Sequence, residues 1–348
     1  MAQDCAPTPD ESLVDTLLGA GLIESPRNTQ FTALSGGVSS DIWLVRSGAR
    51  SFCVKRALAR LKVAAEWLAP IERNRYEVAW LRKVRTIVPE AVPEVIWHDE
   101  HAMILVMEWL APDQHALWKS ELRDGRVDAG VAAQVGDRLG RIHAATADDR
   151  SLDAVFPPNE IFHAIRLEPY LEATALRHPD LQDRLFALSV RTGAQRRAMI
   201  HGDISPKNIL VGANGPVFLD AECACIGDPA FDLAFCLNHL MLKCLWCPPA
   251  AEALLAAFST LTEAYFARLS WESRDALEAR VASLLPGLFL ARVDGKSPAE
   301  YLTPGQDRDR VRAVARALLF SPPPTLAAVA AAWRARLHRD GFAVRAQA

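Results

Sequence analysis

The residues best suited to do chemistry lie in the segment 201–208 and at the end of a short hairpin that follows it. Asp203 precedes Asn208 by five positions, and Asp220 comes 17 positions after Asp203. Phosphoryl transfer needs a carboxylate that accepts a hydroxyl proton, together with oxygen ligands for Mg²⁺. A polar turn with an Asp-capped hairpin explains any one of these residues, but their joint spacing favours a site for phosphoryl transfer.

The first elements that must position such a site are expected to form a three-stranded antiparallel meander, with strands at residues 30–34, 41–46 and 51–56. In the third strand Phe52 and Val54 share one face, so Lys55 lies on the other. Lys55 therefore faces a site that the glycine-containing loop between the first two strands covers.

The rest of the chain predicts a small β-rich lobe followed by a larger helical lobe. One helix and two more strands, at residues 74–85, 94–98 and 102–108, complete the order β, β, β, α, β, β. Beyond residue 113 the pattern is helical apart from one β interruption, and Pro169 and Pro286 are expected to kink or divide two helices. The predicted helices are 131–145, 157–175, 181–193, 229–245, 250–269, 274–294, 308–319 and 325–338, and the β interruption is at 209–211 and 217–219. The expected fold class is α+β, with one lobe at residues 1–110 and a second at 111–348.

Three segments, 201–208, 219–220 and 227–234, resemble the aminoglycoside phosphotransferase and choline kinase superfamily, which is related to the protein kinases. They are similar to its catalytic loop, its metal-binding segment and the following helix. The resemblance covers roughly residues 30–320 and implies a protein-kinase-like fold of two lobes. It also implies an ATP- and Mg²⁺-dependent enzyme that phosphorylates a hydroxyl group of a small molecule, such as a sugar, an amino alcohol or an aminoglycoside.

The resemblance implies roles for residues of the second lobe. Asp203 is the expected catalytic base, Asn208 and Asp220 are the expected Mg²⁺ ligands, and Asp232 is expected to brace the catalytic loop. His201 is interpreted as a packed, hydrogen-bonded support, because Asp203 already serves as the base.

In the first lobe the resemblance implies that Lys55 pairs with the α- and β-phosphates and that Glu77, rather than Glu72, aims it. The carbonyl of Glu108 and the amide of Leu110 are expected to bind adenine. The loop that covers the phosphates is expected to use backbone N–H groups of small residues, namely Ser35, Gly36, Gly37 and Ser39.

Five further residues keep two interpretations each. Lys207 contacts the γ-phosphate or is a solvated loop lysine, and Glu222 holds a second metal or a substrate group or lies on the surface. His239 and Lys243 are four apart on one helix face, where a solvated face explains them somewhat better than an acceptor site does. Arg292 is a candidate for the acceptor site, although a helix end capped by glycine explains a cation there without any ligand.

The amino-acid composition limits the classes of partner that we expect this protein to bind. The 348 residues include 39 Lys plus Arg against 42 Asp plus Glu, and 50% are hydrophobic. This excludes bulk disorder and a nucleic-acid partner bound through a basic face. The chain has no long apolar run and no secretory signal, so we expect no membrane span and a cytoplasmic location. Its seven cysteines are interpreted as buried thiols rather than as a zinc site.

Two alternatives to a small-molecule kinase remain at this point. A pseudokinase would lack the base or a metal ligand, and none is missing. A protein kinase is disfavoured because Phe231 follows Asp220 by only 11 positions, which leaves little room for a peptide-docking segment. The sequence does not name the acceptor or the oligomeric state. Methylthioribose kinases resemble the chain in some respects, but their catalytic loop tends to depart from the pattern that Asn208 follows here.

Overall fold

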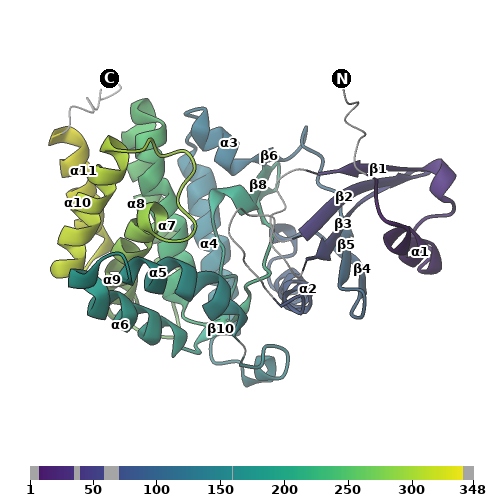
Figure 1. Ribbon diagram of the computed structural model, residues 1–348, viewed down its shortest axis with the longest axis horizontal. Helices are drawn as coiled ribbons and strands as arrows, with labels where there is room; N and C mark the ends of the chain where they lie inside the picture. The colour runs from purple at the N-terminus through teal and green to yellow at the C-terminus, as the bar shows by residue number, and fades with distance from the viewer. Residues whose placement is uncertain (1–7, 35–39, 59–69, 159, 340–348) are drawn as a thin grey trace.

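The structure is a computed structural model that describes residues 8–34, 40–58, 70–158 and 160–339. Its smaller part is a five-stranded antiparallel sheet in the order β1-β2-β3-β5-β4, with one helix before it and one inserted within it (Figure 1). The predicted order β, β, β, α, β, β is confirmed. The elements are α1 (Glu11–Gly19), β1 (Thr29–Ala33), β2 (Ser40–Ser47), β3 (Arg50–Ala57), α2 (Arg73–Arg85), β4 (Val95–Asp99) and β5 (Ile104–Glu108).

One face of this sheet is covered by α1. Asp10 caps the helix by accepting a hydrogen bond from the Leu13 N–H at 2.8 Å, and Leu13 packs against Phe52 and Val54 of β3. Because side chains alternate along a strand, Lys55 lies on the opposite face, as predicted. The sheet therefore buries its apolar side chains under α1 and turns the lysine away from them.

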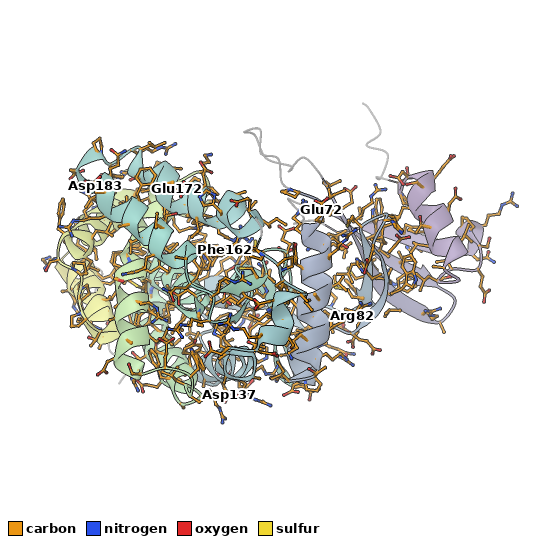
Figure 2. All side chains as sticks on the ribbon, turned by 90° about the horizontal axis from the view of Figure 1, so that it is seen from below. Glu72, Arg82, Asp137, Phe162, Glu172 and Asp183 are labelled. Carbon is orange, nitrogen blue, oxygen red and sulfur yellow. The ribbon has the colours of Figure 1, made fainter. Side chains whose placement is uncertain are left out.

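Helix α2 joins the two parts of the molecule. Figure 2 shows it, with Glu72 and Arg82 labelled, between the sheet with α1 and the large group of helices. Its buried side chains Trp80 and Val84 belong to the same hydrophobic core as the larger part. The predicted division at residue 110 assigns α2 to the first lobe, although much of its apolar face packs on the second.

The larger part is mostly helical, and the predicted helices are present. Three short strands and one short helix, β6, β7, β10 and α3, were not predicted, because two- to six-residue elements show too little periodicity. None of the described helices is both long and apolar enough to cross a membrane. The elements are β6 (Ala116–Leu117), α3 (Trp118–Arg123), α4 (Ala129–Thr146), α5 (Ala173–Ala175), α6 (Gln182–Gly193), β7 (Ala198–Ile200), β8 (Ile209–Gly212), β9 (Gly215–Phe218), β10 (Cys225–Gly227), α7 (Pro229–Trp246), α8 (Ala251–Phe266), α9 (Arg274–Asp294), α10 (Gln306–Phe320) and α11 (Leu326–Arg339).

The two internal prolines behave differently from each other. Pro286 lies inside α9, which continues from Arg274 to Asp294, so the predicted division there is wrong. Pro169 lies in a π-helix, His163–Glu172, that runs into α5. Proline has no N–H to donate to a preceding carbonyl, and the wider turns of a π-helix occur where the regular α-helical ladder is interrupted.

Helices α4 and α8 pack closely on each other in the larger part of the molecule. A Cβ on Gly136 would lie 2.2 Å from the Leu261 carbonyl oxygen, and one on Gly140 would lie 2.9 Å from that of Tyr265. Glycine at these positions lets the two backbones approach each other. This holds the last turn of α4 in place, where His143 Nε2 lies 3.3 Å from a carboxylate oxygen of Asp232 in α7.

Candidate active site

The segment 201–208 is a loop between β7 and β8 whose start is fixed by α7. Asp232, in the first turn of α7, accepts hydrogen bonds from the backbone N–H groups of His201 at 2.7 Å and Gly202 at 2.8 Å. Gly202 has φ 77°, and a Cβ there would lie 2.7 Å from the Cβ of Cys223, so the turn requires glycine. The bracing contact that the sequence predicted for Asp232 is present.

His201 joins this loop to the segment that carries Asp220. The Asp203 N–H donates to His201 Nδ1 at 3.1 Å, which leaves the Nε2–H to donate to the Leu219 carbonyl at 3.0 Å. The ring is fully buried against the edge of Trp80, and burial lowers its pKa. A neutral imidazole with both nitrogens occupied supports the loop and has no site for proton transfer.

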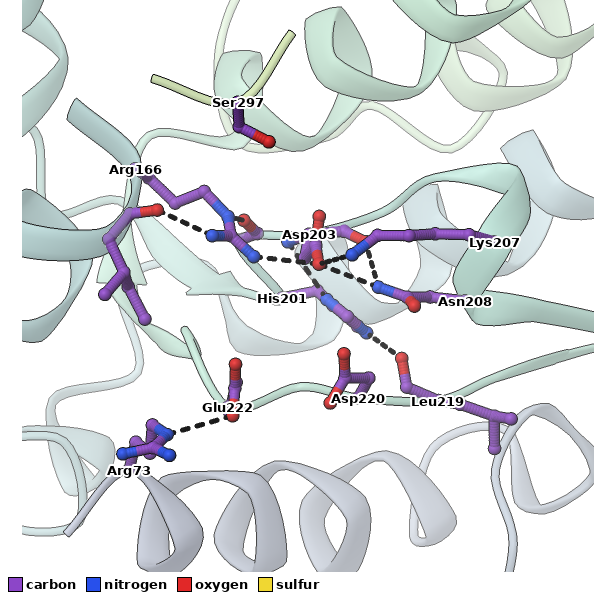
Figure 3. A network of polar contacts seen from close by, with 12 residues as sticks. Arg73, Arg166, His201, Asp203, Lys207, Asn208, Leu219, Asp220, Glu222 and Ser297 are labelled. Atoms are coloured by element: carbon purple, nitrogen blue, oxygen red, sulfur yellow. Dashed lines mark hydrogen bonds and ion pairs between the residues drawn. The ribbon is translucent and has the colours of Figure 1, made fainter. Parts of the chain in front are cut away.

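The carboxylate of Asp203 is bonded through only one of its oxygens. Oδ2 accepts from Asn208 Nδ2 at 2.8 Å and forms ion pairs with Arg166 at 2.8 Å and Lys207 at 3.0 Å (Figure 3). Oδ1 is buried and has no hydrogen-bond partner in the described part of the chain. Burial raises the pKa of Asp203, but Arg166 and Lys207 outweigh it and hold the pKa below its usual value. Asp203 is therefore an ionised carboxylate whose Oδ1 has no hydrogen-bond partner among the described residues.

Arg166 was not singled out from the sequence. It lies in the π-helix, where its Nε–H donates to the Gly202 carbonyl at 2.7 Å while its Nη2 pairs with Asp203. One guanidinium thus holds both the backbone and the side chain of the catalytic loop. A lone arginine in the apolar stretch around Ile165 was the available signal, because a buried cation needs a partner. π-Helical segments are also frequent at functional sites.

Asn208 and Asp220 present oxygen atoms next to Asp203. The amide of Asn208 donates through Nδ2 to the Asp203 carbonyl at 3.0 Å as well as to its carboxylate, which leaves Oδ1 for another partner. Asp220 has φ 68°, a left-handed backbone that few non-glycine residues adopt and that is found most often where function requires it. These are hard oxygen donors of the kind that suits Mg²⁺.

Lys55 forms a buried ion cluster with two carboxylates. Its Nζ lies 2.8 Å from an oxygen of Glu77 and also contacts Asp220 Oδ1. Burial lowers the pKa of Lys55, but Asp220 and Glu77 raise it well above its ordinary value, so the ammonium is charged. Glu72, the rival carboxylate, lies at the start of α2 and makes no such contact. The structure therefore places Glu77 beside Lys55, as expected.

Glu222 does not lie on the surface, so that interpretation is wrong. Its carboxylate forms an ion pair with Arg73 at 3.0 Å, and both side chains are buried. Arg73 also donates to the carbonyls of Pro70 at 2.8 Å and Leu58 at 2.6 Å. Glu222 therefore links the segment after Asp220 to the start of α2.

The predicted nucleotide site has two further parts, a phosphate-covering loop and an adenine-binding segment. Ser35, Gly36, Gly37 and Ser39, the expected phosphate-covering loop, lie outside the described residues. Glu108 ends β5, where its N–H donates to the Glu94 carbonyl at 2.9 Å, and Leu110 follows the strand. Their contact with adenine stays a prediction.

The solvated face expected for His239 and Lys243 is wrong. His239 is 6% exposed and Lys243 1%, because α7 is apolar on all sides and is buried among other helices. Arg292 is also buried. The predicted cap is present, with the Gly295 N–H donating to the Ala291 carbonyl at 2.8 Å, but the arginine side chain points inward and bonds Ser297 Oγ at 3.0 Å. The sequence missed this inward direction.

The cysteines form no metal site within the described ranges. All six described cysteines are free thiols, including Cys223, Cys225, Cys244 and Cys247. No group of three or more His, Cys, Asp or Glu side chains in those ranges could hold a metal ion. Burial raises the pKa of Cys244 to about 12, as expected for an unreactive buried thiol.

Comparison with known proteins gives a consistent result. A model of the phosphotransferase enzyme family matches residues 30–277. The chain is 26% identical over 284 residues to a methylthioribose kinase of Pectobacterium atrosepticum, covering 71% of this chain and 70% of that protein. It is 27% identical over 286 residues to the methylthioribose kinase of Pectobacterium carotovorum, with the same shares.

Solved structures share the fold. An amicoumacin kinase in complex with AMP-PNP, Ca²⁺ and Ami has a TM-score of 0.55 and 16% identity, covering 91% of this chain and 96% of that one. Choline kinase LicA from Streptococcus pneumoniae has a TM-score of 0.53 and 15% identity, covering 89% and 99%.

Proposed function

Because this chain belongs to the phosphotransferase enzyme family and is an ATP-dependent small-molecule kinase, we propose that Asp203 is the base that activates its hydroxyl acceptor. The observation that carries the proposal is a carboxylate whose Oδ2 is bonded to Asn208, Arg166 and Lys207 while its Oδ1 has no partner among the described residues. A fixed carboxylate with one free oxygen orients a hydroxyl group and accepts its proton as the phosphoryl group transfers.

Asn208 and Asp220 fit a Mg²⁺ ion. Both supply oxygen donors beside the base, and Mg²⁺ takes few protein ligands because it keeps water and nucleotide phosphates in its shell. When bound, the ion would neutralise charge on the β- and γ-phosphates. The protein's own contribution is to hold these two donors at the end of the loop that His201 and Leu219 fix together.

Lys55 and Glu77 serve the nucleotide. The lysine ammonium contacts Asp220 on one side and Glu77 on the other. In the complex we infer that Lys55 binds the α- and β-phosphates, Ser35, Gly36, Gly37 and Ser39 cover them, and Glu108 and Leu110 bind adenine. The first lobe, residues 1–110, then binds ATP, and residues 111–348 bind the acceptor.

The acceptor is proposed to be a small hydroxyl compound. Two relatives are named methylthioribose kinases, which supports a sugar or a similar polyol. The compartment is proposed to be the cytoplasm, because ATP is available there and the described buried cysteines are free thiols. Neither a nucleic-acid nor a membrane partner enters this proposal.

The test is ADP formation from Mg-ATP with a panel of sugars, polyols, hydroxy acids and amino alcohols, for the wild type and Asp203→Asn. Loss of a general base should lower kcat about 10²–10⁴-fold without weakening ATP binding. Asp183→Asn is the matched control, because Asp183 is exposed at the far end of the larger lobe from α2 (Figure 2). Full turnover by Asp203→Asn would remove Asp203 as the base, and a chain that binds no Mg-ATP would contradict the whole proposal.

A further inference from the structure

Helices α7 and α9 pack against each other (Figure 1). Basic side chains from both helices lie near one another. We define the α7–α9 cationic cluster as Lys243 and His239 of α7 and Arg292 of α9. All three side chains are more than nine-tenths buried. In the described part of the chain, none of the three forms an ion pair with a carboxylate.

Lys243 has aromatic rings where a buried lysine normally has an acid. Its Nζ lies 4.4 Å from the ring centre of Trp246 and 4.6 Å from that of Tyr301, and the two rings stack on each other. The nearby acid, Glu300, is already paired with Lys119 at 2.5 Å. Burial lowers the pKa of Lys243 to about 7, assisted by Lys119 and Arg292 and opposed by Glu300. Among the described residues, the Lys243 ammonium therefore has aromatic neighbours but no carboxylate partner.

Arg292 is only partly satisfied. Its Nη1 donates to Ser297 Oγ at 3.0 Å and to the Ser297 carbonyl, and it lies 3.4 Å from the Tyr170 hydroxyl. Its Nε is buried without a partner in the described residues, and so is the hydroxyl of Tyr301 beside Lys243. Buried donors without partners are rare in folded proteins, and each costs free energy unless a ligand fills it.

Two side chains, Phe235 and Arg166, lie between the α7–α9 cationic cluster and the proposed base, Asp203. The centre of the Phe235 ring lies 5.3 Å from that of His239 and 5.4 Å from that of Tyr170. The guanidinium carbon of Arg166 lies 6.0 Å from the centre of the same Phe235 ring. Arg166 in turn binds Asp203. In Figure 3 the Ser297 hydroxyl is directed towards Arg166 and Asp203. A series of neighbouring side chains, His239, Phe235 and Arg166, therefore connects the α7–α9 cationic cluster to Asp203.

We propose, on the basis of the function proposed above, that the acceptor carries an anionic oxygen group, a carboxylate or a phosphate, and that Lys243 and Arg292 bind it. Two buried cations without acid partners repel an amino alcohol or an aminoglycoside and attract an anion. The anion would supply an acceptor for Arg292 Nε, which is buried without a partner in the described residues, and a counter-charge for the Lys243 ammonium, whose described neighbours are the rings of Trp246 and Tyr301. His239 is neutral here, because burial and the neighbouring cations lower its pKa well below the ordinary value, so it contributes a polar contact rather than charge.

The first experiment measures anion binding directly. With Mg-ADP at saturation to fill the nucleotide site, malonate, sulfate and uncharged malonamide are titrated while Tm is followed. We expect a saturable rise in Tm with malonate or sulfate and none with malonamide. The rise should need roughly 10- to 100-fold more anion in Lys243→Met and Arg292→Met. Absence of a saturable rise, or an equal rise in both variants, would overturn the proposal.

Matched controls separate local from general charge effects. Lys83→Met removes a lysine of α2 that pairs with Asp149, and Arg334→Met removes a surface arginine of α11 that pairs with Glu252. Both should keep the wild-type response to malonate and sulfate. If they lose it to the same extent as Lys243→Met, the response comes from net charge and the proposal fails.

The second experiment measures turnover with compounds paired by charge. Glycerate is compared with glycerol and with ethanolamine, and ribose 5-phosphate with ribose. We expect kcat/KM to favour the anionic member at least tenfold, and the two pairs distinguish a carboxylate from a phosphate. Efficient turnover of ribose or ethanolamine, unchanged in Lys243→Met, would uphold the kinase and overturn the anionic acceptor. A protein that binds malonate or sulfate as expected but fails to bind Mg-ATP would uphold the anion site and overturn the kinase.

Discussion

The two sides of this active site handle buried charge in opposite ways. On the nucleotide side, Lys55 is shared by Glu77 and Asp220, and the carboxylate of Asp203 is matched by Arg166 and Lys207. On the acceptor side, the α7–α9 cationic cluster has no described acid within ion-pair distance, and its lysine lies against aromatic rings instead. One side is neutralised by the protein and the other retains positive charge.

The difference shows what each side requires of its ligand. Paired charges on the nucleotide side keep the site folded without a ligand, and phosphates with a metal ion can exchange with the existing partners. Unpaired cations on the acceptor side destabilise the free protein and are stabilised when an anion binds. Removing a charge should therefore have opposite effects on stability on the two sides.

The largest effect is expected for Lys55→Met. It leaves Glu77 and Asp220 facing each other without their shared cation, so the free energy of unfolding should fall by about 3–5 kcal/mol. Urea unfolding followed by circular dichroism measures this, with Lys83→Met as the control for loss of a partly exposed lysine. A loss below about 1 kcal/mol would show that the nucleotide side does not depend on its ion cluster.

A smaller loss of stability is expected for Asp232→Asn. The variant weakens two charge-assisted hydrogen bonds to the backbone of His201 and Gly202, which should lower the free energy of unfolding by about 2 kcal/mol. It should also lower kcat, because the loop that carries Asp203 loses its brace. The control is Asp153→Asn, a surface carboxylate paired with Arg196. Unchanged kcat with lowered stability would limit Asp232 to a folding role.

Lys243→Met is expected to raise the free energy of unfolding instead of lowering it. At pH 6 this variant should be more stable than the wild type by about 1–3 kcal/mol, because it removes a buried ammonium without an acid partner. The folded pKa of about 7 lies below the ordinary 10.5, so the unfolded chain binds more protons between these values and wild-type stability rises with pH there. The advantage of the variant should shrink between pH 7 and 10. Urea unfolding at pH 6 and 9 tests this, and equal destabilisation at both values contradicts it.

Acceptor binding should also depend on pH. An anionic acceptor needs the Lys243 ammonium, so its KM should rise by up to tenfold per pH unit above about 7. Initial rates with glycerate or ribose 5-phosphate between pH 6 and 9 measure this. The rise should be absent in Lys243→Met and absent for KM of ATP. A flat profile in the wild type would remove Lys243 from acceptor binding.

How far the sequence predicted the site depends on the distance between partners along the chain. Asp203 and Asn208 lie in one short loop, so their spacing indicated their role. The ion pair of Lys55 with Glu77 was implied by the resemblance to the superfamily, and the predicted order of a strand and the next helix agreed with it. Arg166 was missed because it lies 37 positions before Asp203 in a helix whose period shows only that it is buried.

The acceptor side was misjudged for a related reason. His239 and Lys243 are four apart, and that spacing is the same on a solvated face as on a buried one. Only packing shows that α7 is surrounded by other helices and that Trp246 and Tyr301 lie beside the lysine. The pairing of Glu222 with Arg73, which also overturned a surface interpretation, joins residues 149 positions apart.

By itself, the sequence determined the order of elements, the α+β fold class and the residues of the catalytic loop, because periodicity and short-range spacing are properties of the chain. Tertiary structure alone decided which charges are neutralised. An ion pair depends on distance in space and on burial, and neither is visible along the chain when the partners are far apart. For that reason the paired charges around Asp203 became distinct from Lys243 and Arg292, which form no ion pair within the described ranges, only in the folded protein.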